Sequence, residues 1–282
     1  MKIIESAREG MQGLSYVIPT KDKVQYINTL LKVGFDTVEI GSIVSKRLIP
    51  QLADTLDVIS QLDVSNTLSR RMVLVVNKKG AEIIAGMEEI TDVSYPFSIS
   101  PEFLKMNLNS TIIKSKETVR EILDICQQSK KEMVLYISMA FGNPYGDDWS
   151  RDLLADWVGI FQEMGVKTIA LSNVAIEIDK IMISETFSNL IPQFPEIEFG
   201  LHLHTSGRNW DELINAAYSD GCRRFDAAIN GMGGCPMSGK EMLGNLNTEN
   251  LLAFCENKSI FANFDLNMLK KAYEHAHNIF HL

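Results

Sequence analysis

Three helix ends in this sequence share one pattern, and that pattern constrains the fold more than any other feature. Gly34, Gly165 and Gly221 each follow a stretch in which apolar residues recur near helical spacing, and a short β-rich run comes soon after each glycine. Glycine is favoured where a helix ends in the left-handed conformation. Helices and strands therefore alternate along the chain, which is typical of a parallel sheet covered by helices.

The whole chain contains eight β-rich runs that are separated by helical patterns. The runs are Lys2–Ser6, Thr37–Ile40, Arg71–Val76, Val93–Ser98, Met133–Ser138, Thr168–Ser172, Glu198–His204 and Arg224–Ala227. Helical spacing is clearest in Thr20–Val33, Lys116–Lys130, Leu153–Met164, Trp210–Ser219 and a C-terminal stretch, Asp265–Phe280. Eight strands that alternate with helices predict an α/β fold, a closed (β/α)8 TIM barrel with an extra C-terminal helix.

The length of the chain agrees with one such barrel. The chain has 282 residues, and a (β/α)8 barrel typically takes about 250. Neither a linker nor a low-complexity segment interrupts the pattern. We therefore expect a single catalytic domain over residues 1–282.

Composition argues against several classes of function. The net charge of −9 argues against a nucleic-acid-binding surface. No apolar run approaches the roughly 20 residues that span a bilayer, and the first residues lack the apolar core of a signal peptide. The four cysteines, Cys126, Cys222, Cys235 and Cys255, form no C-x-x-C pair and are too few for a disulfide framework. We expect a cytoplasmic protein that binds neither nucleic acid nor membrane.

Two of the five histidines lie in one strand-like segment, Leu201-His202-Leu203-His204. Residues i and i+2 of a strand point to the same face, so both imidazoles can reach one metal ion. The alternative is a pair of hydrogen-bonded core histidines at a strand end. His275 and His277 have the same spacing in a helical pattern, where they point about 200° apart, and we interpret them as solvated or structural.

In a barrel of this kind the chemistry sits at the C-terminal ends of the strands. This rule selects residues without reference to any motif. The selected residues are Arg8-Glu9, Glu39 to Ser42, Ser138 to Tyr145, Ser172-Asn173, His202 with His204, and the loop after the eighth strand.

Arg8 and Glu9 are adjacent opposite charges at the end of the first strand. The planar guanidinium of Arg8 can hold a carboxylate or a carbonyl oxygen, and Glu9 can offer an oxygen to a hard divalent cation. The alternative is a surface ion pair at the start of a loop.

The loop after the eighth strand is rich in glycine and contains one cysteine, Cys235. A cysteine in a glycine-rich loop at the catalytic face is a candidate acid, base or nucleophile. The alternative is a small buried residue beside a turn, and we assign the other three cysteines to the core. Asn245 follows this loop and its amide oxygen is a candidate metal ligand, while Asn247 is a candidate helix N-cap.

The chain resembles the 3-hydroxy-3-methylglutaryl-CoA lyase family over nearly its whole length. This family lies within a wider group of metal-dependent barrel enzymes that includes isopropylmalate and homocitrate synthases. The resemblance is carried by AREGMQG (7–13), TVEIGSIVSKRLIPQLADT (37–55), SMAFGNPYGD (138–147), GLHLHTSG (200–207) and GMGGCPMSGKEMLGNLNTENL (231–251). The last segment is the most specific, because it is similar to the lyases and is not expected in the synthases.

The resemblance implies a metal site. His202 and His204 match the two histidine ligands of the family and Asn245 matches its asparagine ligand, while Glu9 stands where the family has an aspartate ligand. Oxygen and imidazole ligands together suit Mg²⁺ or Mn²⁺, with Zn²⁺ less expected at an open, oxygen-rich site.

The resemblance also implies roles in catalysis and substrate binding. Arg8 matches the arginine that orients the acyl carbonyl and stabilises the enolate, and Cys235 matches the cysteine of the mobile loop. His202 is a further candidate for proton transfer. The expected substrate-binding residues are Gln12, Glu39, Asn173 and Glu249.

Three departures from the family pattern affect the same site. Glu9 is one methylene longer than the aspartate of the family, Asn173 replaces an aspartate, and Thr205 replaces the acid that follows the second histidine. An amide cannot act as a general base, so these departures bear on substrate and rate.

The resemblance predicts a divalent-metal-dependent lyase that cleaves 3-hydroxy-3-methylglutaryl-CoA, or a similar 3-hydroxyacyl-CoA, to acetyl-CoA and acetoacetate. A homodimer is expected, and Lys46 and Arg47 are either contacts for the CoA phosphates or solvated loop charges. Two alternatives remain open: an aldolase-like or condensing relative that acts on a 2-oxo acid, and a CoA-ester-binding homologue with weakened catalysis.

Overall fold

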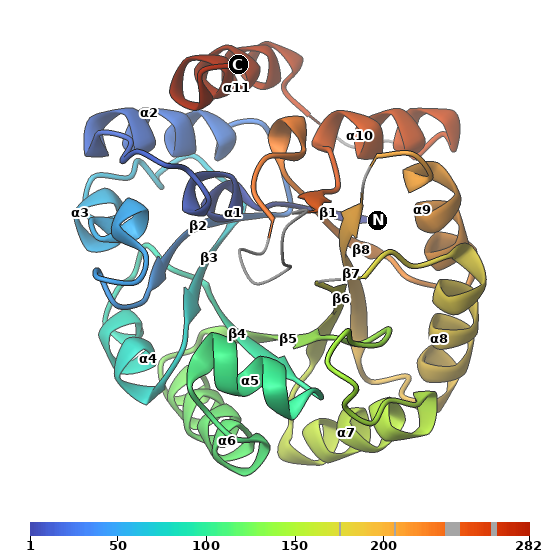
Figure 1. Cartoon of the computed structure of the whole chain (residues 1–282). Coiled ribbons are helices and arrows are strands. Elements are labelled where there is room, and N and C mark those ends of the chain that lie inside the picture. Colours follow the sequence, from blue (N-terminus) through green and yellow to red (C-terminus); the bar gives the residue numbers. More distant parts are fainter. Residues whose placement is uncertain (175, 206, 235–242, 261–263) are drawn as a thin grey trace.

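The computed structural model describes residues 1–174, 176–205, 207–234, 243–260 and 264–282. Eight parallel strands form the centre of the molecule (Figure 1). They are β1 (Lys2–Glu5), β2 (Thr37–Ile43), β3 (Arg70–Val75), β4 (Asp92–Ser98), β5 (Glu132–Ser138), β6 (Thr168–Asn173), β7 (Glu198–Thr205) and β8 (Arg224–Ala227). Each strand pairs with the next, and β8 pairs with β1, so the sheet closes. The predicted TIM barrel is confirmed.

Helices surround the barrel in a ring (Figure 1). They are α1 (Ala7–Gln12), α2 (Thr20–Leu30), α3 (Thr55–Ile59), α4 (Lys78–Ala85), α5 (Pro101–Leu108), α6 (Ile112–Gln128), α7 (Arg151–Met164), α8 (Lys180–Gln193), α9 (Trp210–Ser219), α10 (Thr248–Asn257) and α11 (Leu266–Phe280). Two 3-10 turns, η1 (Pro50–Leu52) and η2 (Ile229–Gly231), and a short strand, β9 (Gly244–Asn245), complete the described part. The predicted C-terminal helix is α11, which packs against the outside of α2. No helix of the described residues is long and apolar enough to cross a membrane.

The three glycines that follow helices have the predicted backbone conformation. Gly34, Gly165 and Gly221 have φ angles of 103°, 101° and 101°, in the left-handed region that glycine adopts without a steric cost. Each glycine reverses the chain after a helix, so that the next strand can start under the helix.

The inside and the outside of the barrel have different compositions. Ile3 belongs to the large apolar core that packs the strands against the helices. Ile4 belongs to a separate small cluster with Met72, Val134, Tyr136 and Ala170. Because neighbouring strand residues point to opposite faces, this second cluster lies inside the barrel. Polar groups such as Glu39 and His202 are also buried there, and they build the site.

A buried carboxyl group connects the first strand to the end of the barrel. Glu5 is fully buried at the end of β1. Its Oε1 accepts a hydrogen bond from the Ile229 amide (3.0 Å), and its Oε2 accepts one from the Thr248 hydroxyl (2.7 Å). Burial raises the pKa of Glu5 to about 8, although both hydrogen bonds oppose this shift. Glu5 thus holds η2 and α10 against β1.

The raised pKa of Glu5 predicts a pH-dependent stability. The unfolded chain loses this proton near pH 4.5 and the folded chain near pH 8, so the free energy of unfolding should fall as pH rises between these values. One proton corresponds to a slope approaching about 1.4 kcal/mol per pH unit. Glu5→Gln should remove this slope, as urea unfolding at pH 5.5 and 7.5 can show, because its amide does not titrate but can still accept from the Ile229 amide and donate to the Thr248 hydroxyl. Glu117→Gln, on the exposed face of α6, is the control. Equal slopes in wild type and Glu5→Gln would contradict the prediction.

Candidate metal centre

Glu9, His202 and His204 converge at the C-terminal end of the barrel. Glu9 lies on α1 and both histidines lie on β7. Glu9 Oε2 is 3.3 Å from His202 Nε2 and 3.9 Å from His204 Nε2. One ligand atom from each of the three side chains lies within 4.8 Å of the other two. This spacing fits a divalent cation with mixed oxygen and imidazole ligands.

The unpaired polar atoms of the site support this assignment. Glu9 Oε2, His204 Nε2 and Asn245 Oδ1 are buried and make no hydrogen bond of normal geometry with any of the residues that the structure describes. A buried polar atom without a partner costs about 1–3 kcal/mol, and a bound cation removes that cost for all three atoms. The residues present therefore fit a divalent metal.

Asn245 reaches the cluster through β9. This strand pairs antiparallel with β7, and Asn245 is the register partner of His204. Asn245 Nδ2 donates to the Met232 carbonyl (2.7 Å), which fixes the orientation of the amide and leaves Oδ1 unpaired. The sequence motif suggested Asn245, and the pairing of β9 with β7 explains how it arrives beside the histidines.

Each histidine is held by its other ring nitrogen. His202 Nδ1 lies 3.0 Å from Asp226 Oδ2, and His204 Nδ1 lies 2.7 Å from the Asn173 carbonyl oxygen. A ring that donates from Nδ1 presents the lone pair of Nε2. The hydrogen bonds therefore favour the tautomer that each histidine needs as a metal ligand.

The charges of the cluster are strongly coupled. Burial opposes protonation of His202, but the carboxylates of Glu9 and Asp226 outweigh it and raise the pKa of His202 to about 10. Burial and the neighbouring His202 lower the pKa of His204 to about 4. Burial also opposes ionisation of Glu9, yet His202 and Arg8 keep its pKa well below the usual value. Without metal, the cluster therefore holds a proton on His202.

Arg8 links the cluster to a second buried carboxylate. Its Nη2 lies 3.0 Å from Glu9 Oε1 and 2.9 Å from Glu39 Oε2, and its Nη1 donates to Gln12 Oε1 (3.0 Å). Arg8 is 5% exposed and Glu39 is fully buried, so the alternative of a surface ion pair is excluded. The predicted residues Arg8, Glu9, Gln12 and Glu39 thus form one connected group.

Asn173 acts on the backbone of β7. Its Oδ1 accepts from the His204 amide (2.9 Å), and its Nδ2 donates to the carbonyls of His204 (2.7 Å) and Ile176 (3.0 Å). Both ends of the amide are occupied by main-chain groups. The structure therefore gives the Asn173 side chain a role in holding His204, whereas the resemblance suggested substrate contact.

The remaining predicted residues lie in different surroundings. Glu249 accepts a hydrogen bond from the Asn230 amide (3.1 Å) and so supports η2. Lys46 and Arg47 are exposed in a turn after β2. Cys235 lies outside the described residues. Two further predictions are confirmed. Cys126, Cys222 and Cys255 are buried, and Asn247 caps the start of α10.

Two glycines allow the loop after β8 to approach α1 closely. Gly233 has a φ angle of 89°, and a Cβ atom there would lie 2.2 Å from the Glu9 carbonyl oxygen. A Cβ atom on Gly10 would lie 3.1 Å from the Phe280 ring of α11 and 3.4 Å from Met232. Close packing on both sides of α1 therefore fixes the backbone that carries Glu9.

Sequence reasoning missed Asp226 and Tyr136. Tyr136 donates a hydrogen bond to Asp226 Oδ2 (2.6 Å), and the same oxygen contacts His202. A weak signal was present, because Asp226 follows Arg224 by two residues in a short strand and so places a second charge on one face. The partner of that charge depends on barrel closure, which a strand pattern does not specify.

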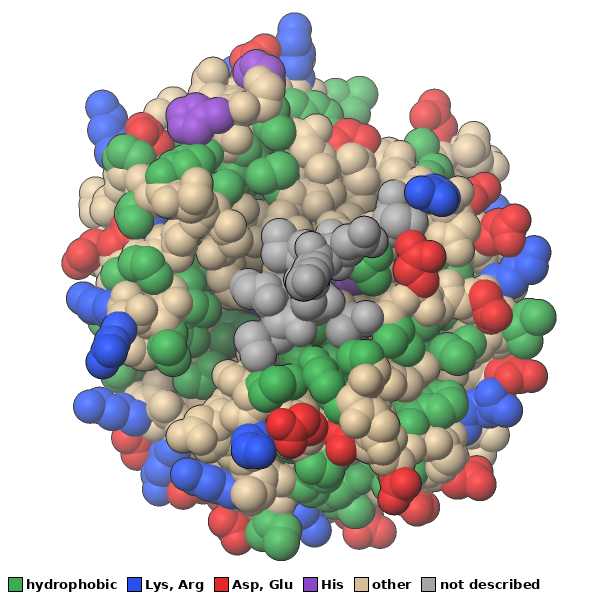
Figure 2. All heavy atoms as spheres, viewed as in Figure 1, with side chains coloured by type: hydrophobic (Ala, Val, Ile, Leu, Met, Phe, Trp, Pro, Cys, Tyr) green, Lys and Arg blue, Asp and Glu red, His purple; other side chains and the backbone are tan. Residues whose placement is uncertain are grey.

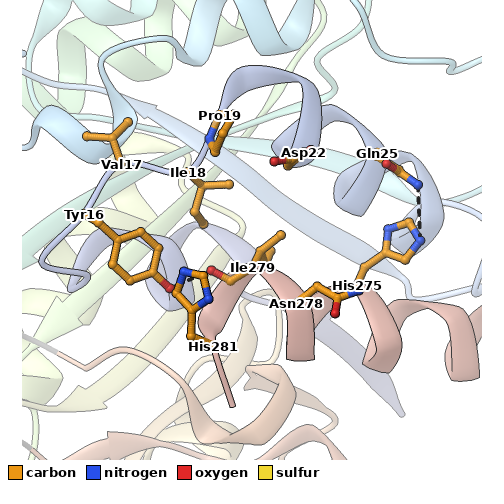
Figure 3. Close-up of a pocket in the computed structure, with 10 residues that line it drawn as sticks. All are labelled: Tyr16, Val17, Ile18, Pro19, Asp22, Gln25, His275, Asn278, Ile279 and His281. Atoms are coloured by element: carbon orange, nitrogen blue, oxygen red, sulfur yellow. Dashed lines mark hydrogen bonds between the residues drawn. The ribbon is translucent and has the colours of Figure 1, made fainter.

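Figure 2 shows the barrel end that carries the candidate centre. Most of its charged side chains lie around the periphery, and mainly hydrophobic and uncharged side chains surround the middle. A separate cavity of about 350 Å³ lies between α2 and α11. Figure 3 shows its lining, which includes Tyr16, Asp22, His275 and His281. None of the candidate metal ligands lines this cavity, so the metal centre is a distinct site.

The sequence matches one family model and several known lyases. The model of the HMGL-like family matches residues 1–275. The hydroxymethylglutaryl-CoA lyase of Bacillus subtilis is 27% identical over 267 residues, which are 94% of this chain and 88% of that protein.

Solved structures of similar proteins agree with this grouping. An HMG-CoA lyase from Brucella melitensis is 26% identical and has a TM-score of 0.90. The match covers 100% of this chain and 99% of the Brucella chain. An HMG-CoA lyase from Acinetobacter baumannii, solved in complex with coenzyme A and 3-methylmalate, has the same identity and TM-score, and the match covers 100% of this chain and 91% of that one.

The ligand assignment predicts the effect of removing one imidazole. His204→Ala should weaken Mn²⁺ binding by more than about 100-fold, because a site with few protein ligands tolerates little loss. Calorimetric titration of metal-free protein measures this change. His275→Ala, on α11, is the matched control and should leave the Kd unchanged. Unaltered Mn²⁺ binding by His204→Ala would show that the assignment is wrong.

The contacts of Asn173 predict that an aspartate is not tolerated well at this position. Asn173→Asp would place a carboxylate oxygen against two main-chain carbonyls, which should lower the free energy of unfolding by about 1–3 kcal/mol at pH 8. The loss should shrink near pH 5, where a protonated acid can donate. Asn77→Asp is the control, because the Asn77 side chain only accepts a bond at the start of α4. An unchanged stability at pH 8 would refute the structural role of the amide.

Proposed function

We propose that this chain, which belongs to the HMGL-like family, is a divalent-metal-dependent lyase that cleaves 3-hydroxy-3-methylglutaryl-CoA to acetyl-CoA and acetoacetate. One observation carries the proposal: ligand atoms of Glu9, His202 and His204 converge beside a buried arginine, and within the described residues Glu9 Oε2 and His204 Nε2 have no hydrogen-bond partner. Relatives at about 27% identity that bear the lyase name support the substrate.

The chemistry requires stabilisation of negative charge at two places. A bound Mg²⁺ or Mn²⁺ would supply a Lewis acid for the hydroxyl and carboxylate oxygens of the substrate. The proposed metal ligands are Glu9, His202, His204 and Asn245. Of the two metals, neither is favoured by the geometry, and Zn²⁺ fits less well with an oxygen-rich ligand set.

Arg8 is the proposed stabiliser of the thioester enolate. Its guanidinium is buried and is held in place by Glu9, Glu39 and Gln12. A donor that is fixed before the reaction stabilises developing charge without the cost of reorganisation. Glu39 keeps this orientation, and the Nε atom of Arg8 has no hydrogen-bond partner in the described part of the chain.

Proton transfer is assigned to two groups. His202, held by Asp226 through Nδ1, is a proposed group for handling the proton of the substrate hydroxyl when it is not serving as a ligand. Cys235 is the proposed donor to the departing enolate, from its family match and the chemistry of a thiol. Glu249 accepts a hydrogen bond from the Asn230 amide of η2, and Asn173 holds the backbone of His204.

A CoA ester is the proposed partner of the site, and a homodimer in the cytoplasm is the proposed form of the enzyme. The Acinetobacter baumannii relative, which is solved with coenzyme A, supports the ligand class. Lys46 and Arg47 are the proposed contacts of the CoA phosphates, because both are exposed after β2.

One observation favours a second candidate function. The Asn173 amide is fully engaged with the backbone, so this position supplies no general base. A CoA-ester-binding homologue with weakened catalysis is consistent with that arrangement. A condensing reaction on a 2-oxo acid has no such specific support.

The proposal is tested by a cleavage assay on the metal-loaded protein. Release of acetyl-CoA from 3-hydroxy-3-methylglutaryl-CoA should require added Mg²⁺ or Mn²⁺ and should be lost in His204→Ala. Binding of the substrate without release of acetyl-CoA would favour the weakened homologue. Formation of a carbon–carbon bond between acetyl-CoA and a 2-oxo acid would replace the lyase assignment.

The role of Cys235 predicts a specific kinetic defect. Cys235→Ser keeps the size of the side chain but has a far higher pKa, so kcat should fall by about 10²–10⁴-fold with little change in Mn²⁺ binding. Ser238→Ala, in the same glycine-rich loop, is the control. A wild-type kcat in Cys235→Ser would remove the cysteine from the mechanism.

A further inference from the structure

We propose that Asp226 and Tyr136 are positioning residues for His202, and that they set the ring nitrogen that His202 offers to the cation. This inference rests on the metal centre of the proposed function. The three side chains form one chain of contacts inside the barrel: Tyr136 Oη to Asp226 Oδ2 is 2.6 Å, and Asp226 Oδ2 to His202 Nδ1 is 3.0 Å.

Strand register brings these groups together. Asp226 and His202 are direct neighbours on the paired strands β8 and β7. Tyr136 comes from β5, two strands away from β7, and its register partner on the intervening β6 is Ala170. Ala170 belongs to the same interior cluster as Tyr136. The short side chain of Ala170 leaves room for the phenol to pass over β6 and reach Asp226.

The contact geometry holds the imidazole in one orientation. The rings of Tyr136 and His202 meet edge to face, with centroids 5.4 Å apart and planes at 86°. His202, Asp226 and Tyr136 are 5%, 2% and 7% exposed, so water does not compete freely for these hydrogen bonds. A phenol that only donates to Oδ2 keeps this oxygen as an acceptor for the Nδ1–H of His202.

The two histidines of the centre are therefore held by different groups. His204 donates to the main-chain carbonyl of Asn173, whereas His202 contacts a carboxylate. A carboxylate acceptor makes an imidazole a stronger ligand than a carbonyl does, and loss of such an acceptor typically weakens metal affinity by about 10–100-fold. Arg224, two residues before Asp226, supplies a positive charge near this carboxylate, and its Nε and Nη2 atoms find no hydrogen-bond partner among the described residues.

The experiment compares two substitutions. Asp226→Asn keeps the shape but can donate to His202 Nδ1, which would move the ring proton to Nε2. Tyr136→Phe removes one hydroxyl and keeps the ring. Mn²⁺ titration of the metal-free full-length protein should give a Kd raised by about 10–100-fold for Asp226→Asn, and a smaller increase for Tyr136→Phe. Nitrogen-15 NMR of the Mg²⁺-loaded protein should show His202 protonated at Nδ1.

Tyr95→Phe is the matched control for the loss of a buried tyrosine hydroxyl. Tyr95 is 1% exposed on β4, and its hydroxyl interacts with Ser115 and Thr118 of α6. This variant should lose stability without a change in Mn²⁺ affinity. An equal loss of affinity in Tyr95→Phe and Tyr136→Phe would overturn the inference, since it would indicate a merely structural effect.

Further outcomes distinguish this inference from the proposed function. If Asp226→Asn does not fold, the wild-type tautomer and Tyr136→Phe still decide the question. Three results would each overturn the inference. The first is protonation of His202 at Nε2 in the Mg²⁺-loaded wild type, and the second is an Mn²⁺ affinity of Tyr136→Phe within twofold of wild type. The third is a wild type that binds no Mn²⁺. Tight Mn²⁺ binding without lyase activity would refute the proposed reaction and leave the roles of Asp226 and Tyr136 intact.

Discussion

The pairing of β1 with β8 is the contact on which the site depends. Glu5 and Ala227 are register partners in this pairing, and the Ser6 amide donates to the Ala227 carbonyl (2.7 Å). The pairing brings Glu9 of α1, which follows β1 directly, to the histidines of β7. Glu9 therefore meets His202 although nearly 200 residues separate them in the chain. Without closure of the barrel, the ligands of the candidate centre would lie on opposite edges of an open sheet.

Closure of the barrel also brings several charged side chains together in its buried interior. Arg8 lies between the carboxylates of Glu9 and Glu39, and His202 lies between those of Glu9 and Asp226. A buried charge without a partner is costly, so each cation in this group has two acidic neighbours. Glu9 is a neighbour of both cations, so these charges form one connected group rather than separate pairs.

The fold was predictable from the sequence to a much greater extent than the contacts of the site. All eight strands were predicted within a few residues, because buried strands between helix ends leave a clear periodic pattern. The six-residue helix α1 was not predicted, since it is short and contains Gly10. His202 and His204 were recognisable from strand spacing alone. Asp226 and Tyr136 were not, because their meeting depends on strand register and on a small residue, Ala170, on the strand between.

Two of the three departures from the family pattern, Glu9 and Asn173, can be understood from the same contacts. Glu9 has one more methylene than an aspartate, and Arg8 holds its Oε1 so that only Oε2 faces the histidines. Gly10 and Gly233 allow α1 to pack closely against its neighbours, which fixes the backbone that carries this side chain. The Asn173 side chain accepts a hydrogen bond from the His204 amide and donates one to the His204 carbonyl. An ionised carboxylate could accept the first bond but could not donate the second. Both residues therefore help to place the proposed metal ligands, Glu9 as one of them and Asn173 through the backbone of His204.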